Sequence, residues 1–215
     1  MKIFYTLLAI CFLQTIALPQ YSVRAGMGID LISSQSVVDY VNQNFASSGN
    51  LLSNFNTAIS FSGEGDYFVK KDFQLGLELG YMLNSYTYLT DAGKFELSYN
   101  VVMPTLVGYY VISGKGYNFK FGGGAGIRLL SVDQTLPATT IAQTYSSTGF
   151  GILLCAEGNT LLSGNLYANI GATFRYDFNG KPKNGNNYIV NNIYQDNVSF
   201  NSLSVGLRLG VSYYF

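Results

Sequence analysis

Hydrophobic and polar positions alternate strictly along residues 203–215, LSVGLRLGVSYYF. Every second side chain from Leu203 to Phe215 is apolar, whereas the residues between them are mostly small or polar and include Arg208 and two glycines. A period of two places all the apolar side chains on one face of a β-strand. The stretch ends on an aromatic ring, which is typical of a strand that meets a lipid headgroup boundary. We therefore predict a membrane-spanning strand here.

The same alternation recurs in seven more segments of the chain. They are residues 21–31, 57–68, 73–85, 95–112, 117–129, 148–157 and 165–176. Short connections (69–72, 113–116 and 158–160) alternate with longer ones (33–56, 87–94, 131–147 and 177–199). Short turns at one end and longer loops at the other are typical of barrels in outer membranes. The pattern predicts an all-β fold, an eight-stranded antiparallel up-and-down transmembrane β-barrel, with ten strands as the less favoured alternative. Both termini and the turns are expected in the periplasm, and the four loops outside the cell.

Alternation alone does not decide which face is outside, because a soluble lipocalin-like barrel carries its apolar side chains inside. In the predicted strands, the charged residues all lie on the parity opposite to the apolar one: Arg24, Asp30, Glu64, Asp66, Glu78, Glu96, Lys120, Arg128, Glu157, Arg175 and Arg208. That parity is also rich in glycine, which suits a narrow interior, whereas the apolar parity carries many large side chains. A Lys or Arg facing lipid at the membrane midplane costs about 2–4 kcal/mol. We therefore predict that the apolar face contacts lipid and the charges line the interior.

The predicted interior contains five basic and six acidic side chains. Buried charges are tolerated when they are paired and hydrogen-bonded. An eight-stranded barrel is just wide enough for side chains to fill it, so we expect these charges to form an ionic network that plugs the interior. The alternative is an ion path through the same residues, as a narrow channel or as a passage that opens sideways to lipid for small solutes.

The composition agrees with a barrel in lipid. Charged residues make up 11% of the chain and hydrophobic residues 48%, whereas ordinary soluble domains are about 25% charged. After residue 18 no apolar run reaches the ~20 residues that a membrane-spanning helix needs. The formal net charge is zero, so nothing points to nucleic acid as a partner.

Residues 1–17 are predicted to be a signal peptide. Lys2 precedes an apolar run over residues 3–13, and small residues surround Ala17 at a plausible cleavage point. Residues 18–215 then form one domain, the barrel. Cys155 is the single cysteine of that domain, so no intrachain disulfide is expected, and its parity directs the thiol inward for packing.

The residue types give no support for an enzyme. The chain has no histidine, which excludes His-based catalytic triads and most zinc sites. The glycine-rich run at residues 122–126 lies inside a predicted strand with no helix after it, so it is not a nucleotide-binding loop. We expect no catalytic activity, cofactor or bound metal.

The loops carry two further features. Ser36 and Asp39 resemble a helix capping box, and Val37, Val41 and Phe45 share one helical face, so a short helix is predicted in the first loop. This helix is interpreted as a lid packed on the barrel rim, with contact to a partner or to lipid as the alternative. The asparagine-rich fourth loop is either a mobile recognition loop or two strands that continue above the membrane.

The last eight residues resemble the C-terminal assembly signal of bacterial outer-membrane barrels. The matching positions are Arg208, Gly210, Tyr213 and Phe215. Nearly all of residues 18–215 resemble small outer-membrane barrels of the OmpA-barrel and OmpX type, including the "porin family" barrel domain. The resemblance implies a monomer in contact with outer-membrane lipid and lipopolysaccharide, inserted by the barrel assembly machinery. It also implies a role in membrane integrity or adhesion, with a surface ligand bound through the loops, or in small-solute passage.

Overall fold

The chain folds into a closed barrel, described for residues 21–46, 49–137, 139 and 141–215 in a computed structural model. Its strands are β1 (Tyr21–Ser33), β2 (Asn56–Lys70), β3 (Phe73–Thr90), β4 (Gly93–Gly114), β5 (Tyr117–Thr135), β6 (Gln143–Ser163), β7 (Leu166–Phe178), β8 (Lys183–Asn184), β9 (Asn187–Tyr188), β10 (Val190–Asn191), β11 (Asp196–Asn197) and β12 (Ser202–Tyr214). One helix, α2 (Gln35–Asn44), lies among these described residues.

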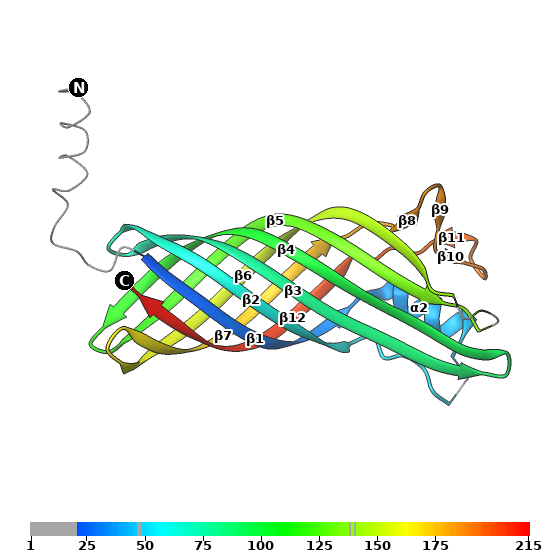
Figure 1. Ribbon diagram of the computed structural model, residues 1–215, viewed down its shortest axis with the longest axis horizontal. Helices are drawn as coiled ribbons and strands as arrows, with labels where there is room; N and C mark the ends of the chain where they lie inside the picture. The colour runs from blue at the N-terminus through cyan, green and yellow to red at the C-terminus, as the bar shows by residue number, and fades with distance from the viewer. Residues whose placement is uncertain (1–20, 47–48, 138, 140) are drawn as a thin grey trace, which may run out of the picture.

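Eight long strands of the described chain form the barrel wall. Each of β1 to β6 pairs antiparallel with the next strand, β7 pairs with β12, and β12 closes the ring by pairing with β1 from Ser22–Tyr214 to Ser33–Leu203. The predicted eight-stranded antiparallel barrel is thereby confirmed. The C-terminus lies at one end, here called the turn end, whereas α2 and the strands β8–β11 lie at the other, the loop end (Figure 1).

The strands continue further toward the loop end than the sequence pattern predicted. The predicted loop over residues 87–94 is wrong, because β3 and β4 run on to a tight turn closed by Thr90 opposite Gly93. The fourth loop, between β7 and β12, contains the strands β8–β11 as two short hairpins, so it holds strands rather than an irregular loop.

The alternation predicted for the two faces holds in seven of the eight wall strands. In β3 and β12, for example, Leu77 and Leu207 are exposed on the outside, whereas Glu78 and Arg208 are buried inside. Cys155 on β6 is also buried inside the barrel, as its parity predicted. Apolar residues therefore cover most of the outer surface of the wall, and the charged strand residues turn inward.

The predicted orientation of β4 is wrong. Phe95, Leu97 and Tyr99 face inward and are buried, so Glu96 faces outward and forms an exposed ion pair with Lys94 at 2.8 Å. Both parities of β4 are apolar over residues 101–112, so hydrophobicity along this strand does not determine its inner face. The inner face follows instead from what fills the loop end.

The helix α2 fills the loop end of the barrel. Val37 and Val41 are buried in a large apolar cluster, and the ring of Phe45 stacks on that of Phe95, with centroids 3.7 Å apart. The predicted lid packed on the rim is therefore present. The predicted capping box is wrong, because Ser34 precedes the helix without a side-chain cap and the Ser36 hydroxyl accepts a hydrogen bond from Ser199 N–H at 2.9 Å.

Among the described residues, no helix has the length and apolar character to cross a membrane. The predicted signal peptide, residues 1–17, lies outside the described residues.

Candidate functional site

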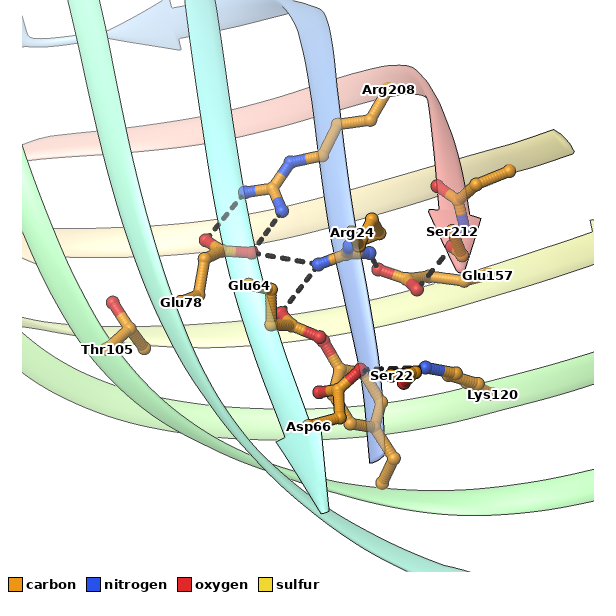
Figure 2. A network of polar contacts seen from close by, with 12 residues as sticks. Ser22, Arg24, Glu64, Asp66, Glu78, Thr105, Lys120, Glu157, Arg208 and Ser212 are labelled. Atoms are coloured by element: carbon orange, nitrogen blue, oxygen red, sulfur yellow. Dashed lines mark hydrogen bonds and ion pairs between the residues drawn. The ribbon is translucent and has the colours of Figure 1, made fainter. Parts of the chain in front are cut away.

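A network of charged side chains occupies the middle of the barrel, and Arg24 of β1 lies at its centre (Figure 2). Its Nη2 is 2.6 Å from Glu64 Oε2 and 3.2 Å from Glu78 Oε2, and its Nη1 pairs with Glu157. These carboxylates come from β2, β3 and β6, so one guanidinium connects four strands of the wall. Alternation explains the arrangement, because each of the four residues lies on the inward parity of its own strand.

Glu78 is shared between two arginines. Arg208 of β12 donates to both of its carboxylate oxygens, Nη1 to Oε2 at 2.5 Å and Nη2 to Oε1 at 3.1 Å. Such bidentate pairs are stronger and more specific in geometry than single contacts. The Tyr109 hydroxyl adds a hydrogen bond to Glu64 at 2.9 Å, so β4 also joins the network.

Lys120 and Asp66 form a pair on the turn-end side of Arg24. Lys120 Nζ is 3.1 Å from Asp66 Oδ2, and both side chains are fully buried. The same oxygen accepts a hydrogen bond from the Ser22 hydroxyl at 3.0 Å, and Gln74 in turn donates to Ser22 at 3.0 Å. A polar chain therefore links β5, β2, β1 and β3 across the interior.

Two further pairs lie toward the loop end. Arg175 Nη2 is 2.5 Å from Asp30 Oδ1, and Arg128 Nε is 2.5 Å from Asp177 Oδ1. Asp177 was assigned to a loop in the sequence analysis, although it continues the parity of Arg175 by one more step. Following the alternation past residue 176 identifies it.

Ten of the eleven predicted interior charges are buried inside the barrel. Glu96 is outside, and Asp177 takes its place, so the interior still contains five basic and six acidic residues. Every one of the five basic side chains has an acidic partner. Removing one partner of such a buried pair typically costs about 3–5 kcal/mol, because the other charge is left unpaired.

Glycines on the inner face make room for these pairs. A Cβ atom at Gly206 would lie 2.2 Å from Asp30 Oδ1, and one at Gly151 would lie 2.4 Å from Arg128 Nε. A side chain at either position would have to displace a charged group from its ion pair. The glycine-rich inward parity therefore reflects the crowding that the sequence analysis inferred.

Amide side chains close the interior at the turn end. Asn169 donates to Asn159 at 3.0 Å, Asn159 donates to Asn118 at 2.9 Å, and Asn118 donates to the Tyr214 hydroxyl at 3.1 Å. The sequence analysis did not single out these residues, because it followed charges and not amides. Their inward parity was the available indication.

Apolar side chains and α2 close the loop end. The cluster includes Tyr40 of α2, Phe95 and Tyr99 of β4, and Phe200. Gln134 donates a hydrogen bond to the Tyr40 hydroxyl, and burial raises the pKa of the Tyr40 phenol above its ordinary value. The interior therefore consists of an amide layer, an ionic layer and an apolar layer between the turn end and the loop end.

Three residues of the predicted assembly signal, Arg208, Gly210 and Tyr213, lie on β12, and Phe215 follows the end of this strand. Arg208 points inward into the ionic network, whereas Tyr213 and Phe215 point outward at the turn end. Phe215 N–H donates to the carbonyl of Tyr21 at 2.9 Å, which fastens the end of the chain to the start of β1. In the described part of the chain, no group of three or more Cys, Asp or Glu residues is arranged to hold a metal ion.

No family model matches this chain, and no curated protein matches it either. Among solved structures, it is similar to the attachment invasion locus protein Ail of Yersinia pestis. The crystal structure of Ail with the heparin analogue sucrose octasulfate has a TM-score of 0.53 at 11% identity, and that of Ail without it 0.52 at 12%; each alignment covers 92% of this chain and 100% of Ail. Neisserial surface protein A aligns at 17% identity with a TM-score of 0.49, over 91% of this chain and 97% of the other. At 11–12% identity the match to Ail identifies the fold alone, that of small outer-membrane β-barrel proteins.

Proposed function

We propose that this protein spans a bacterial outer membrane as a monomeric, plugged barrel whose loop end is an interaction surface. The observation that supports it most directly is the interior, filled by three layers of side chains from one end to the other. An open pore needs a column of water along its axis, and porins that have one are built from about 16–18 strands. The proposal includes no catalytic role.

The outer surface supports the location in lipid. Large apolar residues such as Leu77 and Ile170 are exposed around the wall, while the charged residues of the same strands are buried. In water such a surface is costly, but in a bilayer it is the favourable arrangement. The turn end then faces the periplasm and the loop end faces outward, which is the common orientation of such barrels. Insertion depends on the assembly machinery, which recognises the last strand.

The loop end supports an interaction with other molecules. Beyond the wall it exposes large apolar side chains, including Ile141, Ile193 and Tyr194. Contiguous apolar patches exposed outside lipid mark interaction sites, and Ile193 and Tyr194 are adjacent in the chain. We therefore assign adhesion or membrane integrity as the role, with a surface ligand or lipopolysaccharide as the partner.

Planar-bilayer recording of the purified, refolded barrel tests the plug. We expect no steady conductance, both for the natural chain and for a matched pair of variants, Glu78→Gln in the ionic layer and Asp91→Asn in the exposed β3–β4 turn. Steady conductance whose ion selectivity changes with Glu78→Gln and not with Asp91→Asn contradicts the plug and favours a narrow channel instead.

A further inference from the structure

Within the described chain, the ionic layer contains one more acidic residue than basic residues, six against five. Toward the loop end, Asp30 and Asp177 each pair with one arginine, so these two pairs are neutral by themselves. The remaining central group has three basic and four acidic residues, all of them buried: Arg24, Lys120, Arg208, Glu64, Asp66, Glu78 and Glu157. If all seven were ionised, one negative charge in the barrel interior would have no partner, and an unpaired buried charge is costly.

Glu64 and Asp66 are two carboxylates of this central group that lie next to each other. They are separated by one residue on β2, so both point into the interior from the same strand. A Cβ atom at Gly76 of β3 would collide with Asp66 Oδ1 and lie 3.4 Å from Glu64 Cδ, so both groups border the space that this glycine leaves. The two carboxyl groups are within hydrogen-bonding reach of each other, and Figure 2 shows them side by side.

Each of these two carboxyl groups has one oxygen with partners and one without. Glu64 Oε2 accepts hydrogen bonds from Arg24 at 2.6 Å and from the Tyr109 hydroxyl at 2.9 Å. Asp66 Oδ2 accepts hydrogen bonds from Lys120 at 3.1 Å and from a serine hydroxyl at 3.0 Å. Glu64 Oε1 and Asp66 Oδ1 are buried and have no hydrogen-bond partner among the described residues. A hydrogen atom between these two acceptors would give both of them a partner.

We propose that the carboxyl groups of Glu64 and Asp66 share one proton, in an O–H···O hydrogen bond between Glu64 Oε1 and Asp66 Oδ1. Two carboxyl groups held this close together do not both ionise, and such a pair retains one proton. The pair then carries a single negative charge, so the central group has three positive and three negative charges. The inference depends on burial inside the barrel and not on which end faces outward, so it goes beyond the proposed function.

The other two acidic residues of the central group have arginine partners for the oxygens that a proton would occupy. Arg208 donates to both oxygens of Glu78, and Arg24 adds a third hydrogen bond. Glu157 pairs with Arg24. A proton on either residue would weaken a contact with an arginine, whereas the proton on β2 lies between two oxygens that have no other partner. The charged and titratable side chains around the pair and its partners are Arg24 (β1), Glu78 (β3), Tyr109 (β4), Lys120 (β5), Cys155 and Glu157 (β6) and Arg208 (β12).

Infrared spectroscopy of the purified barrel in lipid vesicles detects such a proton directly, because a protonated carboxyl group and a carboxylate have different carbonyl stretching bands. At neutral pH we expect a band of a protonated carboxyl group, which shifts when the barrel is folded in D2O. The band should be absent from Glu64→Gln and from Asp66→Asn, because the carboxyl group that remains in each variant ionises alone. Asp91→Asn, in the exposed β3–β4 turn, is the matched control and should leave the band unchanged.

Urea unfolding in lipid vesicles supplies the second measurement. Glu64→Gln keeps the pair at one negative charge and offers an amide donor to Asp66 Oδ1, so the urea midpoint should stay close to that of the natural chain. The double variant Glu64→Gln with Asp66→Asn removes the remaining charge of the pair. It should lower the midpoint about as far as Glu78→Gln does, because each of these changes leaves one basic residue unbalanced.

Three results would overturn the shared proton. The first is the absence of a protonated-carboxyl band from the natural chain, and the second is a band that persists in both Glu64→Gln and Asp66→Asn. The third is a urea midpoint that is higher in sodium chloride than in choline chloride at equal ionic strength and loses this dependence in Glu64→Gln. That result would assign the place between the two carboxylates to a monovalent cation instead. None of these results bears on the conductance test, so the shared proton can fail while the plugged barrel stands.

Discussion

Replacement of Glu78 by glutamine tests how far the ionic network stabilises the barrel. Glu78 is the one acidic partner of Arg208 among the described ion pairs, whereas Arg24 also contacts Glu64 and Glu157. Glutamine has nearly the same shape as glutamate but no charge. The variant therefore leaves the buried Arg208 guanidinium without a counter-charge and leaves Arg24 with two.

The number of counter-charges left to each arginine sets the expected loss in the free energy of unfolding. Breaking a buried pair by neutralising one partner costs about 3–5 kcal/mol. The glutamine oxygen still accepts a hydrogen bond, so we expect the lower end, about 3 kcal/mol. Glu157→Gln is the matched control, because its partner Arg24 keeps two other carboxylates. This variant loses one charged hydrogen bond, which should lower the free energy of unfolding by about 1.5–3 kcal/mol at most.

Urea unfolding in lipid vesicles measures both variants. The chain has no tryptophan and 18 tyrosines, so tyrosine fluorescence and the mobility shift between folded and unfolded protein on denaturing gels are suitable readouts. The double variant Glu78→Gln with Arg208→Leu should recover much of the loss, because removing both charges avoids an unpaired one. The reasoning is refuted if Glu78→Gln costs no more than Glu157→Gln, or if the double variant loses the sum of both changes.

Three further changes test other parts of the molecule. Leu207→Arg on the outer wall should destabilise the barrel in vesicles by about 2–4 kcal/mol, whereas Leu89→Arg at the exposed tip should stay within about 0.5 kcal/mol; equal losses in urea unfolding would contradict a lipid-facing Leu207. Phe215→Asp should reduce the folded, fast-migrating form in cells if the terminal strand directs insertion, and an unchanged yield would contradict this. Val41→Asp should make the loop end sensitive to protease while the wall still resists heat, because a carboxylate in the apolar cluster has no partner; an unchanged cleavage pattern would argue against α2 as a packed lid.

Most of the wall could be predicted from the sequence because one physical rule applies to it. A period of two fixes the face of each residue, so Arg24, Glu64 and Glu78 were assigned to the interior without knowledge of their partners. The partners themselves depend on register and on side-chain reach across the barrel. No pattern within a single strand reports that Glu78 is shared by Arg24 and Arg208.

The loop end could not be predicted in the same way, because the wall there has no apolar outer face. Beyond the apolar belt, β3 and β4 carry Ser85, Thr87 and Ser98 outward. The sequence analysis expected apolar residues on the outer face of every strand. A segment with polar residues outside and aromatic residues inside was therefore interpreted as a loop. Residues 87–94 were assigned to a loop for this reason.

The orientation of β4 and the position of α2 explain each other. A strand that turns Phe95, Leu97 and Tyr99 inward needs an apolar partner inside, and α2 provides it through Val41 and Phe45. Conversely, the buried valine face of α2 cannot pack against charged side chains, so the ionic layer must end on the turn-end side of this helix. Glu96 therefore lies on the outer face, even though it is an acidic residue of a wall strand, as are Glu64 and Glu78. A predicted helix in the first loop therefore constrains which parity of a neighbouring strand faces inward, and combining the two predictions would have assigned Glu96 to the surface.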